Sequence, residues 1–310
     1  MADLLNFVIA YLITTIPIYI WKEKKEKATN IKNIFYTLCW FIISILVTSL
    51  LVFLFKEKIV LNVIVPSCLG FSLFNYLVLE EKISTNFSKL FLIFIGFFFA
   101  STLQIIPIKL FNLNLKDLSI DTRVLLTLFS DFIFFLILLM IYSKDLKKDF
   151  KVFKKNYNAQ LDVAFKYYFI GLIIMMASNL LINTLSPSSM ASNEESVQSM
   201  IKASPYVTLI CTGILAPVIE ELVFRKAFRD AFQNKWLFIT LSGIIFGGLH
   251  VILSISSIYD LLYLIPYCSL GISFGYIYIK SNNIFTSISL HALHNTILTI
   301  ISIISYMVIL

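Results

Sequence analysis

Long apolar runs separated by short charged segments are the feature that most constrains this 310-residue chain. A helix needs about 20 mostly apolar residues to cross a bilayer, and about ten runs approach or reach that length. They lack the strict alternation of a transmembrane β-barrel. The predicted spans are residues 4–21, 34–55, 59–79, 88–108, 124–143, 163–185, 205–221, 236–254, 258–279 and 284–310. We therefore predict an all-α fold, a polytopic transmembrane helical bundle.

Composition supports membrane insertion and gives no reason to expect a nucleic-acid partner. Apolar residues make up 59% of the chain and charged residues 14%, against about 25% charged in soluble domains. The net charge of +7 is explained by loops that meet anionic lipid headgroups, so membrane lipids are expected partners. All four cysteines fall inside predicted spans without CxxC spacing, which argues against a disulfide framework. The oligomeric state has no signature in the sequence.

The distribution of Lys and Arg predicts the orientation of the spans. With the N-terminus outside, the predicted cytoplasmic loops hold 18 of the 25 basic residues, the outer loops hold six, and Lys166 lies within a span. Cytoplasmic loops of membrane proteins carry the excess of positive charge. The count therefore predicts that both termini lie outside.

Polar residues divide the chain near residue 160. The spans before that point are almost purely apolar, and Asp131 is their one buried ionisable candidate. A carboxyl group in lipid is a functional candidate, but it can also serve helix packing, and both interpretations stay open. We predict an N-terminal transmembrane region of unknown role over residues 1–160 and a functional core over residues 161–310.

A pair of glutamates near the end of the seventh predicted span begins the functional core. Placing such a charge at the centre of a bilayer costs about 2.5–3.5 kcal/mol, so it needs a reason. Glu221 and Arg225 are four residues apart, which places them on one helix face within reach of a salt bridge. Glu220 is rotated by about 100° from Glu221. It is therefore free to face a cavity, where a carboxylate can serve as a general base.

The three histidines of the chain lie in the last spans at apolar depth. His291 and Asn295 share a helix face at four-residue spacing, and Phe246 and His250 repeat that spacing one span earlier. Any one of these side chains could instead hold helices together through hydrogen bonds. Gathered in the last third of the chain beside the glutamate pair, they indicate a polar site inside the membrane.

Three motifs in this order resemble the CPBP family of intramembrane proteases. Residues 220–225 fit EExxxR, residues 246–250 fit FxxxH and residues 291–295 fit HxxxN. The family includes the CAAX prenyl endopeptidases and the bacterial Abi proteins that are linked to bacteriocin processing and immunity. The resemblance covers about residues 160–310, and it implies a helical protease core there.

The resemblance also implies the role of each motif residue. Glu220 would be the general base that activates water, with assistance from His250. His291 and Asn295 would donate hydrogen bonds to the developing oxyanion. Supporting positions would be Glu221, Arg225 and Phe246. His294 is not a motif position, and we interpret it as a structural neighbour.

The sequence leaves the participation of a metal open. No HExxH motif is present, which excludes a zincin helix. Glu220, His250 and His291 are the residues that could form an open three-ligand Zn²⁺ site. A metal-free mechanism uses the same side chains, and we prefer it slightly.

Depth within the membrane poses a difficulty for this site. A seventh span that ends at residue 221 would put Glu220 near the cytosolic face, and the site is expected on that side. His250 would lie about 21 Å into its own span, at 1.5 Å per residue. Pro217 can kink one helix, and Gly247 and Gly248 permit close approach of another.

Together these features predict an endopeptidase that hydrolyses a membrane-associated protein or peptide. CAAX-type substrates, pheromones and bacteriocin leaders are the candidate classes. One alternative is a non-catalytic immunity or scaffold protein that keeps the same residues for packing. A transporter is a further alternative, but the absence of paired halves in the sequence argues against it.

Overall fold

The computed structural model confirms the helical prediction. Its described residues are 2–21, 30–55, 58–80, 82–114, 116–185, 191–252, 255 and 258–309. Within them every regular element is a helix, and nine helices are long and apolar enough to cross a membrane. The chain is therefore a multi-pass membrane protein. The basic segment 22–27 and Lys56, which entered the orientation count, lie outside the described ranges.

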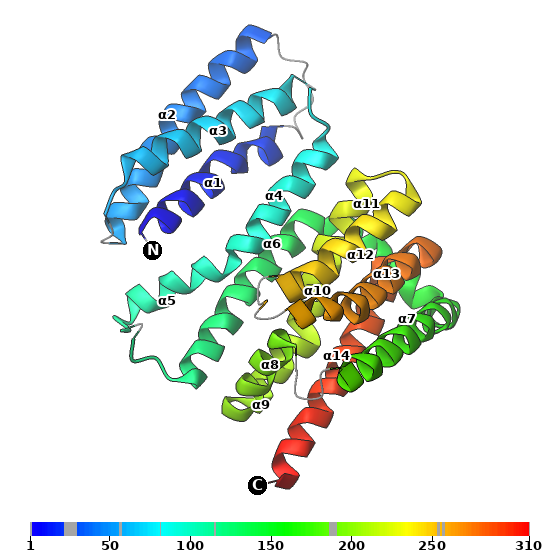
Figure 1. Ribbon diagram of the computed structural model, residues 1–310. Coiled ribbons are helices and arrows are strands. Elements are labelled where there is room, and N and C mark those ends of the chain that lie inside the picture. The colour runs from blue at the N-terminus through cyan, green and yellow to red at the C-terminus, as the bar shows by residue number, and fades with distance from the viewer. Residues whose placement is uncertain are drawn as a thin grey trace. The chain divides into compact units, whose positions relative to one another are not determined.

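Figure 1 shows the described chain as a succession of helices, coloured from blue near the N-terminus to red near the C-terminus. They are α1 (Ala2–Trp21), α2 (Asn30–Leu54), α3 (Leu61–Leu79), α4 (Thr85–Phe99), η1 (Ala100–Gln104), α5 (Ile105–Leu110), α6 (Ile120–Lys155), α7 (Tyr157–Leu185), α8 (Ser192–Ala203), α9 (Pro205–Ile210), η2 (Cys211–Leu215), α10 (Ala216–Glu220), η3 (Glu221–Ala227), α11 (Phe228–Ala231), α12 (Lys235–Ile252), η4 (Ile258–Tyr263), α13 (Leu264–Ser281) and α14 (Ile284–Ile309). The segments η1 and η4 are 3₁₀-helical, whereas η2 and η3 are π-helical.

The chain divides into two compact units, Met1–Leu113 and Asn114–Leu310. In the first unit α1, α2 and α3 pack on one another through apolar side chains. Buried amides add hydrogen bonds between these helices: Asn75 Nδ2 donates to the Thr14 carbonyl at 2.6 Å, and Asn6 Nδ2 donates to the Lys58 carbonyl at 3.1 Å. Such bonds satisfy backbone and side-chain groups that lipid cannot satisfy.

The boundary between the units falls earlier than the change of polarity near residue 160. Helix α6 packs with the C-terminal helices, because its last turns carry acidic side chains that bind them. Asp145 forms an ion pair with Lys226 at 3.0 Å. The Ile284 N–H donates to Asp149 Oδ2 at 3.3 Å, and Asn283 Nδ2 donates to the Asp149 backbone carbonyl at 2.7 Å. Residues 114–160 therefore belong to the same compact unit as the functional core.

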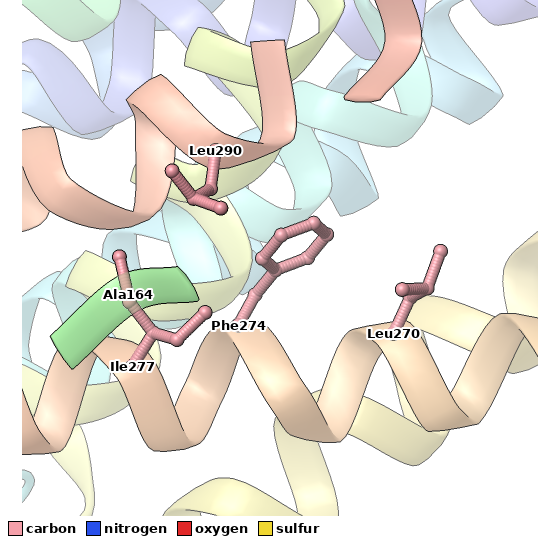
Figure 2. Packing of buried hydrophobic residues seen from close by; sticks show 5 residues of the cluster. All are labelled: Ala164, Leu270, Phe274, Ile277 and Leu290. Carbon is pink, nitrogen blue, oxygen red and sulfur yellow. The ribbon is translucent and has the colours of Figure 1, made fainter. Parts of the chain in front are cut away.

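An apolar cluster joins the helices α7, α13 and α14 of the second unit. Figure 2 shows Phe274 and Ile277 of α13 beside Leu290 of α14 and Ala164 of α7. All four side chains are at most 1% exposed. Burying a large apolar side chain contributes about 1.5–3 kcal/mol in water, and in lipid its close packing replaces that driving force. The cluster fixes α13 and α14 beneath the site described below.

Glycines allow α12 and α13 to approach each other at backbone distance. A Cβ atom built on Gly247 would lie 2.6 Å from the Cys268 backbone nitrogen, and one on Gly243 would lie 2.8 Å from the Ile272 backbone nitrogen. Neither contact can be relieved by a rotamer change, because the obstacle is backbone. Small residues at helix interfaces permit this close packing in membranes, as the sequence suggested for the Gly247–Gly248 pair.

Adding one methyl group at Gly247 is expected to destabilise the protein, whereas adding it at the next position is not. Gly247→Ala forces α12 away from α13, and we expect a loss of about 1–3 kcal/mol, the usual cost of overpacking. Gly248→Ala meets only the flexible end of Ile252 at 3.4 Å, so it should be neutral or stabilising. Thermal unfolding of both variants in detergent measures the difference, and equal melting temperatures would contradict the backbone contact.

The helix that carries the glutamate pair is longer than the sequence predicted. The predicted span ended at Glu221, but the helix continues to Ala231. Its charges are paired locally: Arg225 with Glu221 at 3.4 Å, and Lys226 with Asp230 at 2.7 Å. The prediction was wrong here because it treated these charges as the start of a loop. The glutamates consequently lie inside this helix and not at its end.

Candidate active site

Two π-helical segments shape the helix that leads to the glutamate pair. At the end of η2 the Ala216 N–H donates to the Cys211 carbonyl, five residues earlier. The next residue is Pro217, which has no N–H to donate. The carbonyls of Thr212 and Gly213 therefore lack the donor that residue 217 would normally supply. A single wide turn of this kind is frequent at functional sites.

Side chains of α14 satisfy both of these carbonyls. Asn295 Nδ2 donates to the Thr212 carbonyl at 3.1 Å, and Thr296 Oγ1 donates to the Gly213 carbonyl at 3.3 Å. Gly213 makes the approach possible, since a Cβ there would lie 2.6 Å from Thr296 Oγ1. Proline and glycine in one helix and polar residues in the other therefore fix Asn295 opposite the glutamate-bearing helix.

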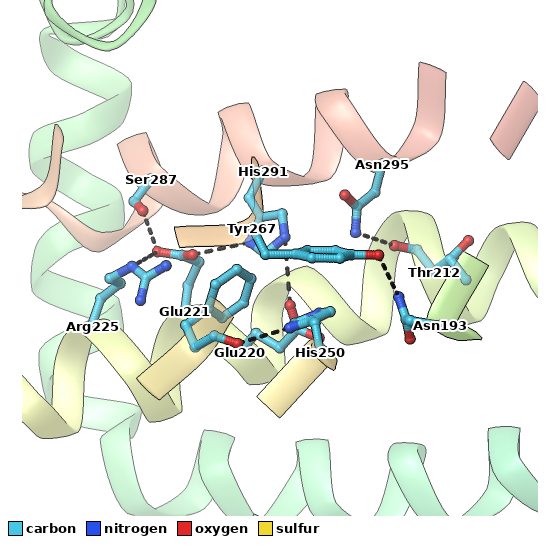
Figure 3. Close-up of polar contacts among 11 residues, drawn as sticks. Asn193, Thr212, Glu220, Glu221, Arg225, His250, Tyr267, Ser287, His291 and Asn295 are labelled. Carbon is cyan, nitrogen blue, oxygen red and sulfur yellow. Dashed lines mark hydrogen bonds and ion pairs between the residues drawn. The ribbon is translucent and has the colours of Figure 1, made fainter. Parts of the chain in front are cut away.

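Glu221 forms the fully buried centre of a polar network. Its Oε2 lies 3.4 Å from Arg225 Nε and accepts a hydrogen bond from Ser287 Oγ, while its Oε1 accepts one from His291 Nδ1 at 3.0 Å (Figure 3). The guanidinium of Arg225 also lies over the Phe246 ring, 4.9 Å from its centroid, a cation–π geometry. The network joins η3 to α12 and α14, so the supporting positions of the motifs do meet in space.

Glu220 points away from that network and contacts His291 from the other side. Its Oε2 lies 3.5 Å from His291 Nε2. The imidazole of His291 stacks on the Phe274 ring at a centroid distance of 4.6 Å. It makes a T-shaped contact with the Phe246 ring at a centroid distance of 5.8 Å. His291 is therefore held between the two glutamates by carboxylates at both ring nitrogens and by aromatic rings around it. The 100° rotation between Glu220 and Glu221 expected from helix geometry gives them these different surroundings.

His250 is oriented by a hydrogen bond to its own helix. Its Nδ1 lies 2.9 Å from the Phe246 carbonyl. A carbonyl oxygen can only accept, so Nδ1 carries the proton, and in the neutral ring the lone pair resides on Nε2. The imidazole stacks on Tyr267 at 4.9 Å with an interplanar angle of 23°. These contacts fix both the tautomer and the plane of the ring.

A cavity of about 190 Å³ opens beside these groups. Glu220, His250 and Asn295 all line it, so residues from three helices face one space. The glutamate side chain is 15% exposed, whereas His291 lies behind it at 4%. The remaining lining residues come from α8, η2, α10 and α14, and they are Asn193, Glu194, Val197, Thr212, Ala216, Leu298, Thr299 and Ser302.

The structure thus brings together all four residues for which the sequence suggested a direct role. Sequence reasoning missed three neighbours: Ser287, Tyr267 and the cavity wall formed by α8. Ser287 could have been found, because it precedes His291 by one helical turn and so shares its face. Tyr267 and α8 carry no such signal, since neither their spacing nor their polarity distinguishes them from ordinary membrane or interfacial helix residues.

Two further candidates from the sequence take different positions. His294 Nδ1 contacts Tyr168 Oη at 2.9 Å in the interior of the helix bundle, consistent with a structural neighbour. Asp131 lies on α6, which packs against α10 and η2. It is close enough to Glu220 and Cys211 to interact with both electrostatically. No hydrogen bond or ion pair joins Asp131 to another residue in the described parts of the chain.

The candidate metal ligands do not assemble into a ligand set. Across the described ranges, no group of three or more His, Cys, Asp or Glu side chains is placed to hold a metal ion. Both nitrogens of His291 face carboxylates, and Nδ1 of His250 faces a carbonyl. The Nδ1 atoms of His250 and His291 are engaged by the Phe246 carbonyl and by Glu221, so a metal could be met only by the Nε2 atoms of these rings.

The fold and the site define a polytopic helical membrane protein with a glutamate–histidine–asparagine cluster beside a cavity between its spans. Comparison with known proteins shows a family match for part of the chain. Residues 202–297 match the family described as type II CAAX prenyl endopeptidase Rce1-like. All three motifs fall inside this segment, so the match confirms the resemblance seen in the sequence.

Two curated proteins are similar to parts of the chain. "Putative membrane peptidase YdiL" of Bacillus subtilis (strain 168) is 30% identical over 111 residues, which are 35% of this chain and 42% of that protein. "UPF0177 protein YxdF" of Lactococcus lactis subsp. lactis (strain IL1403) is 26% identical over 144 residues, which are 44% of this chain and 77% of that protein. No solved structure matches the chain.

Proposed function

We propose that this protein is an intramembrane endopeptidase that hydrolyses a peptide bond of a membrane-associated protein or peptide. The observation that carries the proposal is the shared cavity: Glu220, His250 and Asn295 line one space, with His291 directly behind the glutamate. The match of residues 202–297 to the Rce1-like family and the similarity to a protein named as a putative membrane peptidase support the same activity.

In the proposed reaction Glu220 removes a proton from a water molecule in the cavity. His250 assists through Nε2, because Nδ1 is bound to the Phe246 carbonyl. The water oxygen attacks the scissile carbonyl carbon and forms a tetrahedral oxyanion. When the C–N bond breaks, the proton held by Glu220 passes to the leaving nitrogen, so that the carboxylate is restored.

The oxyanion would be stabilised by donors from α14. Asn295 has two amide N–H groups, and one of them already binds the Thr212 carbonyl, which leaves the second for substrate. His291 Nε2 faces Glu220 at 3.5 Å. Once Glu220 has taken up a proton, its attraction for that nitrogen falls, which leaves an Nε2–H available to the oxyanion without movement of the ring. Donors of this kind are worth about 10²- to 10³-fold in rate.

The nature of the cavity bears on the substrate. Most of its lining side chains are polar, which suits an unwound peptide segment whose backbone groups need hydrogen-bond partners in the membrane. We propose a pheromone, a bacteriocin leader or a CAAX-type protein as substrate classes, in a metal-free reaction.

The orientation is likewise a proposal. The excess of Lys and Arg on one side supports both termini outside the cell membrane. We also propose that the site opens toward the cytosolic side, because in this orientation the helix that carries Glu220 and ends at Ala231 runs from the outside to the cytosol.

Comparative peptidomics tests the proposed activity and identifies the substrate. Cells that produce the parent protein are compared with cells that produce Glu220→Ala at equal membrane abundance. We expect peptides with defined new termini in the parent cells that are absent or more than about tenfold depleted in the variant cells. Identical peptide profiles, with the biological phenotype kept by Glu220→Gln, would favour a non-catalytic immunity or scaffold protein.

A further inference from the structure

Helix α8 contributes a second carboxylate to the cavity, at a position outside the three motifs. Glu194 lines the same space as Glu220, together with Asn193 and Val197 of its own helix. We infer that Glu194 makes the site select substrates that carry a positive charge near the scissile bond, either a Lys or Arg side chain or a free amino terminus. This inference rests on the proposed peptidase function and names the substrate feature that the cavity recognises.

The Glu194 side chain is held in place by a neutral donor. Gln198 Nε2 donates to Glu194 Oε1 at 2.8 Å and lies 3.2 Å from Ser302 Oγ of α14. The amide therefore ties the carboxylate to the neighbouring helix without neutralising its charge. One hydrogen bond occupies a small part of the accepting capacity of a carboxylate, which has about four lone-pair sites.

No cation of the described chain neutralises Glu194. Its one described polar contact is the amide of Gln198, and no Lys or Arg is among the residues that line the cavity. Arg225, the basic residue of the polar network, is fully buried and paired with Glu221. Among the described residues the cavity therefore presents the carboxyl groups of Glu194 and Glu220 and one imidazole, with no Lys or Arg to balance them.

The position of Glu194 at the start of a helix does not account for these features. Acidic residues are favoured in the first turn, where the helix dipole is positive, and both Glu194 and Glu195 occupy that turn. Only Glu194 faces the cavity, whereas Glu195 is exposed. The helix dipole accounts for an acidic residue at either position. It does not account for the cavity that Glu194 alone faces, where a ligand can reach its carboxylate.

A carboxylate in a half-enclosed space attracts cations more strongly than one on an open surface. The apolar helices around the cavity lower the local dielectric and concentrate the field within it. A close charge pair between protein and ligand is worth about tenfold or more in affinity. A negative charge on the substrate at the same position would be repelled, so the preference should reverse with the sign of either partner.

The test uses a set of fluorescence-quenched ten-residue peptides based on the sequence cleaved in cells. At each position in turn the peptide carries Lys, its uncharged isostere norleucine, or Glu, and one further pair has a free or an acetylated amino terminus. The full-length protein in proteoliposomes is assayed as parent, Glu194→Gln, Glu194→Lys and Glu195→Gln. Equilibrium binding of the same peptides to Glu220→Gln measures the preference without cleavage and without the second carboxylate.

We expect the parent and Glu195→Gln to prefer Lys over norleucine by about tenfold in kcat/KM at one or two adjacent positions. In Glu194→Gln the ratio should fall to about one, and in Glu194→Lys the Glu peptide should become the preferred one. A preference confined to the free-amine pair would assign the cation to the amino terminus. Equal ratios in parent and Glu194→Gln, or equal binding of all peptides to Glu220→Gln, would overturn the inference.

The proposed peptidase function fails separately from this inference. It fails when the parent cleaves none of the peptides, or when Glu220→Ala cleaves them as fast as the parent. The binding measurement decides the role of Glu194 in either case, because it depends on the charge in the cavity and not on turnover.

Discussion

Replacing Glu220 with Gln is expected to lower the rate of peptide cleavage by about 10²- to 10⁴-fold, the usual contribution of general-base catalysis. Gln keeps the size of the side chain and can still contact His291, whose Nε2 lies 3.5 Å from the Glu220 carboxylate. It cannot accept a proton from water. The loss should appear in kcat, with a smaller change in KM, because the removed step belongs to the transition state.

The measurement uses purified full-length protein in proteoliposomes with a peptide identified from cells. His250→Ala should reduce kcat as well, since Nε2 of that ring is the second acceptor at the cavity. Glu195→Gln is the matched control, because it removes a carboxylate that is exposed outside the cavity. Thermal unfolding of each variant shows whether the fold is kept. A Glu220→Gln variant that folds normally and cleaves at the parental rate would end the proposed mechanism.

Much of the fold follows from the sequence, because a bilayer imposes one simple demand on a chain. In a bilayer, the backbone N–H and C=O groups of a run of about 20 apolar residues can find hydrogen-bond partners only if the run is helical. The predicted spans correspond to helices of the structure. Two helices continue well past their predicted ends: the helix of the glutamate pair ends at Ala231, and α6, whose span was predicted to end at residue 143, ends at Lys155. Both ends were misjudged because charged residues look like a loop in the sequence. Arg225 and Lys226 form ion pairs only in the folded helix.

The candidate site was predictable to the extent that its residues share faces of single helices. The separate surroundings of Glu220 and Glu221 follow from helical rotation, and their contacts with His291 agree with that geometry. Contacts between helices could not be read in this way. The donation from Asn295 to the Thr212 carbonyl depends on the missing N–H of Pro217 and on the register of α14, and register is set by packing.

The buried ion pair beneath the site should be the most sensitive point for stability. Glu221 and Arg225 are both fully buried, and removing one partner of such a pair costs about 3–5 kcal/mol, because the other charge stays in the interior uncompensated. The two single variants should differ. In Arg225→Met the carboxylate keeps Ser287 and His291 as donors. In Glu221→Gln the guanidinium loses its only described counter-charge and keeps the Phe246 ring.

We therefore expect Glu221→Gln to lower stability at least as much as Arg225→Met. No side chain or backbone group of the described residues accepts a hydrogen bond from the Arg225 nitrogens, so Glu221 is its one ion-pair partner among the described residues. The double variant Glu221→Gln/Arg225→Met should recover part of the loss, because it leaves no unpaired charge.

Asp230→Asn is the control: it breaks the partly exposed pair with Lys226, which is worth about 0.3–1 kcal/mol. Thermal unfolding in detergent at fixed pH compares all four variants. Additive losses in the double variant would mean that the two charges do not stabilise each other, and the network around Glu221 would then hold through its hydrogen bonds to α14.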